Sequence, residues 1–363
     1  MSRIQQLYRS EGQSPWLDNL KRGWITGGEI SRWVERGVRG ITSNPTILQK
    51  AMESTDAYDE QLGDLVSAGE AISETYWDLV TSDIGDALDL LRPVHDSSGG
   101  SDGFVSVEVA PELARDTEGT IAAARTLHER IAKPNLLVKI PGTEEGLPAI
   151  RQMLSEGHSI NVTLIFSLER YSEVMEAYLS GLEARDGDLS AVSSVASFFI
   201  SRVDTETDRR LEALGNDEAL ALRGKAAVAQ GKLAYQMFLD RFRGPRWEAL
   251  EARGAKVQRP LWASTSTKNP AYPDTKYVDE LIGPNTVNTL PDETLDLFDD
   301  HGTLGRTLDT DVGQAGADWE AVGRFVDMGD VGQTLEDEGL SAFGKSFDEV
   351  LSALATKAES FKT

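Results

Sequence analysis

A lysine interrupts an otherwise apolar run at residues 135–140, which reads NLLVKI and precedes Pro141 and Gly142. Lysine is rarely fully buried, because removing an isolated ammonium group from water is costly. Burial disfavours the charged form and leaves a neutral amine, which is able to attack a carbonyl and form a Schiff base. Lys139 is therefore a candidate nucleophile for carbonyl chemistry.

Two other apolar runs carry polar side chains at every second position. Ser106 and Glu108 share one face of VSVEV, and Asn161 and Thr163 share one face of INVTLI. Adjacent strands lie about 4.8 Å apart, so Glu108, Lys139 and Thr163 stand side by side if these faces meet. Glu108 would then move the protons of Schiff-base formation and hydrolysis, directly or through a water held by Thr163. A purely structural ion pair between Lys139 and Glu108 is the alternative.

Further polar residues lie at or just beyond the ends of apolar runs. They are Asp18, Asn44, Ser197, Arg202, Ser264 and Lys268. Each has a structural alternative. Asp18 is as often a turn-former or a helix cap, and Asn44 precedes a proline, so capping alone accounts for it. The structural alternative for Arg202 is an ion pair with Asp204, and for Lys268 it is a solvated position in a loop. Ser197 and Ser264 are small enough to be packing residues without a role in binding.

The overall charge bears on the partners that the protein accepts. Sixty acidic residues against 36 basic ones give a net charge of -24 in 363 residues. This field opposes binding to nucleic acids and to anionic membranes. An anionic ligand would therefore need local arginines or lysines, which makes Arg202 and Lys268 worth following.

The composition also limits the chemistry and the compartment. The chain contains no cysteine, which excludes disulfides, thiolate metal sites and cysteine nucleophiles. The four histidines, at positions 95, 128, 158 and 301, have no ligand spacing, so we expect no metal and no other cofactor. No run approaches a membrane span and the N-terminus has no apolar signal region. These features predict a cytoplasmic protein. They do not fix its oligomeric state, for which we expect a monomer or a homodimer.

The elements that must position these residues follow from short apolar runs that alternate with helical periodicity. Eight candidate strands lie at residues 15–18, 37–42, 103–109, 135–140, 159–165, 191–199, 259–265 and 285–289. Helical patterns cover residues 111–132, 168–185 and 219–243. Eight βα units without a G-x-G-x-x-G after the first strand predict an α/β fold, a (β/α)8 TIM barrel. Such barrels carry their chemistry at the C-terminal ends of the strands, where the candidate residues lie.

The chain continues for more than seventy residues beyond the last strand. We predict a barrel catalytic domain at residues 1–290 and a C-terminal helical extension, packed on the barrel, at 291–363. Within the extension, a helix should end at Gly302, and the Ser346-x-x-Glu349 spacing predicts the start of a final helix. The acidic, glycine-containing stretch at 302–345 has the weakest pattern.

Taken together, five segments are far more specific than any single residue. They are GITSNPTILQKA, VSVEVAPELARDTEGTI, NLLVKIPGTEEGLPAI, INVTLIFS and SFFISRVD, in this order. Their order and spacing resemble those of transaldolases of the longer form, over residues 14–290. The resemblance implies a class I aldolase barrel that moves a dihydroxyacetone unit between sugar phosphates in the non-oxidative pentose phosphate pathway.

The resemblance also implies a role for each matching residue. Lys139 is the Schiff-base lysine, and Glu108 is the acid/base that works with Thr163 through a water. Asp18 matches the base that takes the C4-hydroxyl proton as the C3–C4 bond breaks.

The remaining matches concern substrate binding. Asn44 and Asn161 correspond to hydrogen-bonding partners of the dihydroxyacetone unit, and Ser197 and Arg202 to contacts near and at the phosphate.

Two departures from the shorter transaldolases are visible. The sixth-strand motif reads Ser197-Phe198-Phe199 in place of SPF, and an ASFR-like segment is replaced by residues 263–266, ASTS. The second phosphate arginine is therefore absent. We assign its role to Lys268, with Ser264 nearby as a further substrate contact.

Two alternatives stay open. One is a fructose 6-phosphate aldolase, but that shorter subgroup has glutamine and tyrosine where this chain has Glu108 and Phe199. The other is a non-catalytic barrel that binds sugar phosphates, which the joint presence of Asp18, Glu108 and Lys139 disfavours. Borohydride trapping tests the second alternative, and release of free dihydroxyacetone without an acceptor tests the first.

Overall fold

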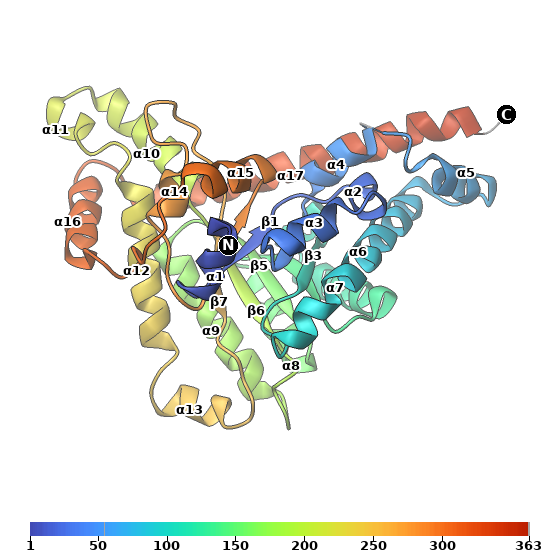
Figure 1. Cartoon of the computed structure of the whole chain (residues 1–363), viewed down its shortest axis with the longest axis horizontal. Coiled ribbons are helices and arrows are strands. Elements are labelled where there is room, and N and C mark those ends of the chain that lie inside the picture. The colour runs from blue at the N-terminus through green and yellow to red at the C-terminus, as the bar shows by residue number, and fades with distance from the viewer. Residues whose placement is uncertain (54, 362–363) are drawn as a thin grey trace.

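Eight parallel strands form a closed barrel in the computed structural model, which describes residues 1–53 and 55–361 (Figure 1). The strands are β1 (Gln13–Leu17), β2 (Gly40–Thr42), β3 (Phe104–Glu108), β4 (Leu136–Pro141), β5 (Ile160–Ile165), β6 (Ser194–Phe199), β7 (Arg259–Ala263) and β8 (Thr286–Leu290). They pair in sequence order and β8 closes on β1. The predicted (β/α)8 barrel is confirmed, and each predicted strand overlaps an observed one.

Helices surround this barrel and connect its strands. Before β5 they are α1 (Arg3–Arg9), α2 (Arg22–Thr26), α3 (Glu29–Arg36), α4 (Pro45–Glu53), α5 (Asp59–Ser67), α6 (Ile72–Ser97), the 3-10 turn η1 (Pro111–Arg115), α7 (Thr117–Ile131) and α8 (Gly146–Glu156). After β5 they are α9 (Leu168–Ala184), α10 (Ser201–Leu214), α11 (Asp217–Leu220), α12 (Ala226–Arg241), α13 (Pro245–Glu251), α14 (Lys276–Asp279), α15 (Asp292–His301), α16 (Val312–Gly323), α17 (Met328–Ala358) and the turn η2 (Glu359–Phe361).

The core explains why the strands read as continuous apolar runs. Every residue of β3, β4, β5 and β6 is buried, because the barrel interior covers one face and the helices cover the other. The register places Glu108 beside Lys139 and Lys139 beside Asn161. Glu108, Lys139 and Asn161 therefore lie side by side, whereas Thr163 lies two residues further along β5, beside Pro141.

The C-terminal extension differs from the sequence prediction. The expected helix before Gly302 is confirmed as α15, which follows β8 directly. The final helix, however, begins at Met328 with Asp327 as its N-cap, and Ser346 lies in its interior. The stretch at 302–345 contains α16 and more than half of α17. The division of the chain at residue 290 stays a prediction.

Glycines in α17 account for the missed helix start. Glycine weakens helix propensity, and α17 contains four glycines, Gly329, Gly332, Gly339 and Gly344. A Cβ atom on Gly339 would lie 3.0 Å from Leu164, the last but one residue of β5. A Cβ atom on Gly332 would lie 3.1 Å from Ser167, two residues past the end of that strand. Two of these glycines therefore allow α17 to lie directly against the end of β5. Tertiary packing outweighs local propensity here.

None of the helices formed by residues 1–53 and 55–361 combines the length and the apolar character that a membrane span requires.

Candidate active site

The lysine of β4 lies inside the barrel beside the glutamate of β3. Lys139 Nζ donates a hydrogen bond to the Ser43 carbonyl oxygen (2.9 Å) and lies 3.3 Å from Glu108 Oε2. Lys139 is only 5% exposed and Glu108 7%. The predicted juxtaposition of Lys139 and Glu108 is confirmed, whereas the strand register places Asn161 and not Thr163 directly beside Lys139. The contact with the Ser43 carbonyl was not predicted, because a backbone carbonyl leaves no signal in the sequence.

Asp18 lies just past β1 and joins a chain of hydroxyl groups. Thr42 Oγ1 donates to Asp18 Oδ1 (2.6 Å) and lies 2.6 Å from Thr289 Oγ1. Burial raises the pKa of Asp18, and the Thr42 hydrogen bond and the charge of Lys139 offset part of that rise. Sequence reasoning missed Thr42, the last residue of β2, and Thr289, the last but one of β8, both of which line the cavity described below.

Glu108 has an environment suited to an acid/base group. Burial raises the pKa of Glu108, while the charge and hydrogen bond of Lys139 act in the opposite direction. Buried polar atoms are normally paired. Glu108 Oε1 and Thr163 Oγ1, however, are buried without a hydrogen-bonding partner in the described part of the chain. Both atoms are thus available to a substrate or to a water.

Thr163 and Asn161 lie at different depths in the barrel. Asn161 pairs in register with Lys139, whereas Thr163 pairs with Pro141, two residues nearer the C-terminal end. The Asn161 amide donates to Ser106 Oγ (3.1 Å) and accepts from Ser197 Oγ (2.7 Å). Asn161 thus binds Ser197 from deeper in the barrel. It does not line the cavity that is described in the next paragraph.

A cavity of about 140 Å³ opens at the C-terminal ends of the strands. Its walls include eight of the ten predicted site residues, all except Glu108 and Asn161. They are Asp18, Asn44, Lys139, Thr163, Ser197, Arg202, Ser264 and Lys268. The structure therefore brings together residues from positions 18 to 268 of the sequence.

The cationic wall of this cavity begins with Arg202, the second residue of α10. Its guanidinium carbon lies 5.5 Å from the centre of the Phe199 ring. Burial lowers the pKa of Arg202, and the charge of Glu338 in α17 partly offsets this effect. None of the ion pairs within residues 1–53 and 55–361 includes Arg202. The alternative pairing with Asp204 is wrong, because Asp204 is paired with Lys276 (3.4 Å).

The other wall residues have mixed roles. Asn44 Oδ1 accepts from the Ile47 backbone N–H (3.0 Å), so Asn44 caps α4 as well as lining the cavity. Ser264 adopts a left-handed backbone conformation (φ 56°), and its hydroxyl lies 3.0 Å from that of Ser201. Lys268 is exposed and lies in the loop after β7.

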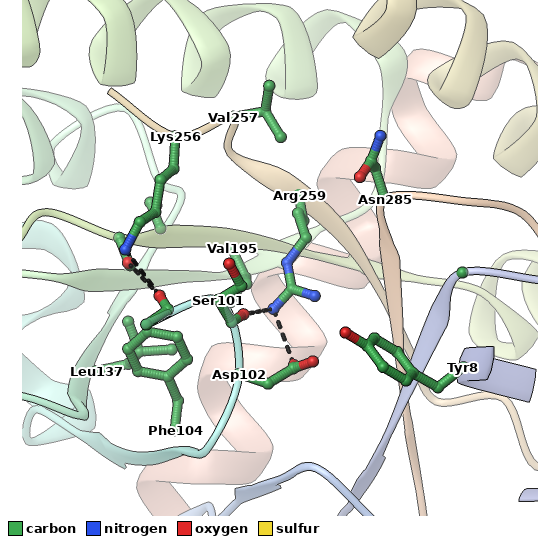
Figure 2. Close-up of a pocket in the computed structure, with 14 residues that line it drawn as sticks. Tyr8, Ser101, Asp102, Phe104, Leu137, Val195, Lys256, Val257, Arg259 and Asn285 are labelled. Carbon is green, nitrogen blue, oxygen red and sulfur yellow. Dashed lines mark hydrogen bonds and ion pairs between the residues drawn. The ribbon is translucent and has the colours of Figure 1, made fainter. Parts of the chain in front are cut away.

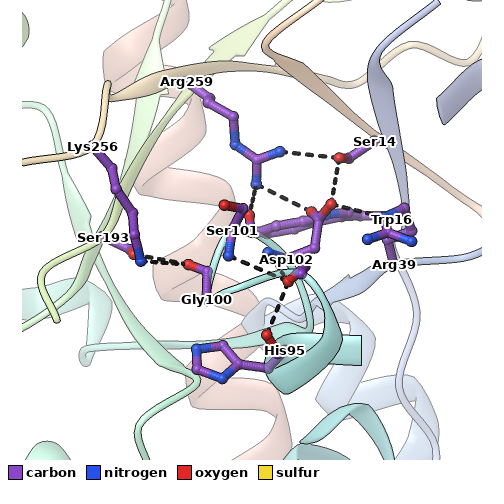
Figure 3. Close-up of polar contacts among 11 residues, drawn as sticks. Ser14, Trp16, Arg39, His95, Gly100, Ser101, Asp102, Ser193, Lys256 and Arg259 are labelled. Carbon is purple, nitrogen blue, oxygen red and sulfur yellow. Dashed lines mark hydrogen bonds and ion pairs between the residues drawn. The ribbon is translucent and has the colours of Figure 1, made fainter. Parts of the chain in front are cut away.

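A larger cavity, of about 250 Å³, lies at the opposite end of the barrel (Figure 2). Its cations already have partners within the protein. Lys256 donates to the Gly100 carbonyl, and Arg259 pairs with Asp102 (3.1 Å) and donates to Ser14 (3.0 Å). Figure 3 shows these contacts converging on the loop around Asp102. We interpret this cluster as structural and place the chemistry at the Lys139 cavity.

Comparison with known proteins agrees with this geometry. The family model described as Transaldolase/Fructose-6-phosphate aldolase matches residues 15–354. The chain belongs to this family. Family membership makes the protein an enzyme, and the match extends through most of α17 as well as the barrel.

Curated relatives resemble the chain over nearly its whole length. A transaldolase from Thermobifida fusca is 51% identical over 98% of this chain and 98% of its own length. Transaldolase 1 from Streptomyces avermitilis is 50% identical, covering 95% and 93% respectively. A transaldolase from Mycolicibacterium smegmatis is 48% identical, covering 97% and 96%. The family is thus supported across both the barrel and the extension.

Proposed function

We propose that the protein is a transaldolase of the non-oxidative pentose phosphate pathway. It transfers a dihydroxyacetone unit from sedoheptulose 7-phosphate or fructose 6-phosphate to erythrose 4-phosphate or glyceraldehyde 3-phosphate. The observation that carries this proposal is the buried Lys139 amine, 3.3 Å from Glu108, on the wall of a cavity that also contains Asp18. The names of the full-length relatives support it.

The first half of the mechanism makes the Schiff base. The Lys139 amine adds to the ketone carbon of the donor, and Glu108 protonates the departing carbinolamine oxygen, which leaves as water. Thr163 holds the water through which this proton moves. The product is an iminium ion, and its positive charge accepts the electrons of the next step.

The second half breaks and remakes a carbon–carbon bond. Asp18 takes the proton of the C4 hydroxyl, the C3–C4 bond breaks, and its electron pair converts the iminium to an enamine. The aldose phosphate leaves, and the acceptor aldehyde takes its place. The enamine attacks it, Asp18 returns the proton, and hydrolysis of the new iminium frees Lys139.

The binding residues divide between the two ends of the sugar. Asn44 and Asn161 bind the dihydroxyacetone unit, and Ser197, which donates to Asn161, lies toward the phosphate. Arg202, with Ser264 and Lys268 nearby, holds the phosphate of the leaving and entering aldose. The planar guanidinium of Arg202 holds two phosphate oxygens at once, which orients the sugar as well as binding it.

Borohydride trapping with fructose 6-phosphate tests this assignment. The iminium should be reduced to a stable amine, and mass spectrometry should place the added mass on the peptide containing Lys139. Lys139→Met should give no adduct. An adduct on Lys268 would overturn the assignment, and no adduct at all would favour a barrel that only binds sugar phosphates.

A steady-state assay distinguishes transaldolase from fructose 6-phosphate aldolase. We expect turnover that depends on erythrose 4-phosphate, because Glu108 and Phe199 stand where the aldolases have glutamine and tyrosine. Comparable release of free dihydroxyacetone without an acceptor would instead support the aldolase.

We further expect catalysis to need no metal and no organic cofactor, because the iminium already supplies the electron sink that a metal would otherwise provide. Activity should survive dialysis against EDTA. Loss of activity that a divalent ion restores would contradict this expectation.

The proposal extends to the setting of the enzyme. The absence of cysteine favours the cytoplasm, and the protein is proposed to be a monomer or a homodimer. Light scattering coupled to gel filtration measures the oligomeric state directly.

A further inference from the structure

One residue of the active-site cavity comes from far outside the barrel. Phe343 of α17 lines the same cavity as Lys139, whereas the other lining residues lie between Asp18 and Pro291. Phe343 is 6% exposed. It adds an apolar ring to walls that otherwise consist largely of hydroxyl, carboxylate, amide and cationic groups.

Contacts on three sides hold α17 across the mouth of the barrel. Next to β5, a Cβ atom on Gly339 would come within 3.0 Å of Leu164 and 3.8 Å of Phe166, so the helix touches the end of that strand. Phe166 in turn packs on Phe199, with ring centres 4.9 Å apart. The cavity is thus bounded on this side by an aromatic layer that α17 covers.

Contacts on the two other sides hold the helix near its start and in its interior. On the α10 side, Arg210 forms an ion pair with Asp330 (2.6 Å). On the α4 side, the Ser346 hydroxyl lies 2.8 Å from the Thr46 hydroxyl. α10 begins next to Arg202 and α4 begins next to Asn44, so both attachments lie on elements that carry site residues. Figure 1 shows α17 running beside α4.

We infer that Phe343 is a specificity-determining residue, which favours transfer to an aldehyde over release of free dihydroxyacetone by limiting water in the active-site cavity. This inference rests on the proposed transaldolase function. Once the aldose phosphate has left, the enamine has two fates. It attacks an acceptor aldehyde, or it takes a proton on carbon to regenerate an iminium.

The second fate ends the reaction without transfer. Water adds to that iminium, the carbon–nitrogen bond of the carbinolamine breaks, and dihydroxyacetone and the free Lys139 amine are released. The proton taken up by the enamine is returned when the amine departs, so the step consumes only water. Both routes end in hydrolysis of an iminium, so they divide at the protonation of the enamine carbon. An apolar ring that limits water, the proton donor, near the enamine slows this protonation and leaves the enamine for the acceptor.

The experiment measures two rates in each preparation with fructose 6-phosphate as donor. One is transfer to erythrose 4-phosphate, and the other is release of dihydroxyacetone without an acceptor. Phe343→Ala should raise the ratio of release to transfer by about tenfold, a difference of about 1.4 kcal/mol between the two barriers. Phe343→Leu, which keeps an apolar side chain, should leave the ratio close to that of the wild type.

Phe347 offers a matched control one turn along the same helix. It is 7% exposed, and it packs on Tyr76 at 5.2 Å between ring centres and does not line the cavity. Phe347→Ala should lower stability without changing the ratio. Phe343→Gln replaces the ring with a polar side chain that is larger than alanine and favourable in helices, so it tests the same point if Phe343→Ala does not fold, and it should raise the ratio.

The outcomes separate this inference from the proposed function. A wild type that transfers nothing to erythrose 4-phosphate refutes the transaldolase function itself. A wild type that transfers normally, with an unchanged ratio in Phe343→Gln and Phe343→Ala, refutes only the role of Phe343. A ratio that rises equally in Phe347→Ala would assign the effect to loosening of α17 as a whole and would also overturn the inference.

Discussion

At the scale of single residues, two of the basic groups that line the cavity, Lys139 and Arg202, differ in the partners that the protein gives them. Lys139 has a carboxylate at 3.3 Å and a carbonyl oxygen at 2.9 Å. Arg202 is largely buried against Phe199 and has no ion-pair partner among residues 1–53 and 55–361. A desolvated guanidinium without a paired carboxylate is suited to an incoming dianion.

Arg202→Ala should therefore lower kcat/KM for fructose 6-phosphate by about ten- to a hundredfold, since a charge-assisted contact contributes about 1.5–3 kcal/mol. Lys268→Ala should cost less, because Lys268 is exposed on a loop. Unphosphorylated fructose is the control substrate, and its slow turnover should change little. Equal losses on both substrates would mean that Arg202 only supports the mouth of the barrel.

Asp18 and Thr42 give a prediction about pH. Asp18 must be ionised to take a proton, and burial raises its pKa above 3.8, so the acid limb of kcat/KM lies above that value. The Thr42 hydrogen bond stabilises the ionised form. Thr42→Val should move the limb to higher pH by about one to two units, because the bond is worth about 1.5–3 kcal/mol and one unit corresponds to about 1.4 kcal/mol.

Thr42→Ser retains the hydroxyl and should leave the acid limb where it is in the wild type. A limb that does not move in Thr42→Val would show that the pH dependence of kcat/KM reports a group other than Asp18.

The strand pattern alone revealed the residues whose chemistry is unusual for their position, whereas residues such as Asn44 and Ser197 were given roles by the family resemblance. A lysine or glutamate on an apolar strand is conspicuous, so Lys139 and Glu108 were predictable. Thr42 and Thr289 were not, because threonine is common in strands for packing reasons alone. The Ser43 carbonyl that accepts from Lys139 has no side-chain signal, and Phe343 looks like an ordinary apolar helix residue.

At the scale of elements, the strands were easier to predict than α17. Short apolar runs separated by helical periodicity are a repeated signal, and closure of the barrel needs no further information. α17 carries four glycines over its 31 residues, which weaken the local helix signal. Two of them, Gly332 and Gly339, lie against the end of β5, more than 150 residues earlier in the chain. A local sequence pattern carries no information about this contact.

Gly339 and Gly344 test this account of α17. Gly339→Leu places a side chain where even a Cβ atom lies 3.0 Å from Leu164, so it should push the helix from β5 and lower both stability and transfer activity. Gly344 has open space around the corresponding position, and Gly344→Ala should raise the free energy of unfolding by about 0.5–1 kcal/mol. Denaturant unfolding and the transfer assay measure both effects.

Equal stability and equal transfer activity of Gly339→Leu and Gly344→Ala would contradict the packing explanation. If Gly339→Leu were as stable and active as the wild type, the close approach of α17 to β5 would have no bearing on the site. The glycines would then be incidental to the position of the helix.

At the scale of the whole molecule, the two ends of the barrel have different tasks. The C-terminal end keeps a cavity lined by Lys139, Asp18 and Arg202, and α17 crosses it. At the other end, polar groups satisfy one another around Asp102, which is 1% exposed in its side chain. Stability and chemistry are thus separated along the barrel axis, so they should respond to different mutations.

Asp102 joins the first, second and seventh strand regions at the N-terminal end of the barrel. Its carboxylate accepts from Ser14 (2.7 Å) and Trp16 (3.1 Å) and pairs with Arg39 (2.8 Å) and Arg259 (3.1 Å). Burial raises the pKa of Asp102, but the charges of Arg259 and Arg39 outweigh it, so the pKa lies below 3.8. The ionised carboxylate therefore stabilises the fold.

Asp102→Asn leaves two arginines without their buried partner and should lower the free energy of unfolding at pH 7 by about 3–5 kcal/mol. Because the folded-state pKa of Asp102 is lowered, its contribution is complete above 3.8 and is lost as pH falls through the folded value, so the difference from wild type should shrink there. Urea unfolding between pH 7 and pH 3 measures this, with exposed Asp96→Asn as the control.

Transfer activity of folded Asp102→Asn at 25 °C should match the wild type, since the Lys139 cavity lies at the other end of the barrel. A loss of activity without a loss of stability would show that the Asp102 cluster acts on the reaction.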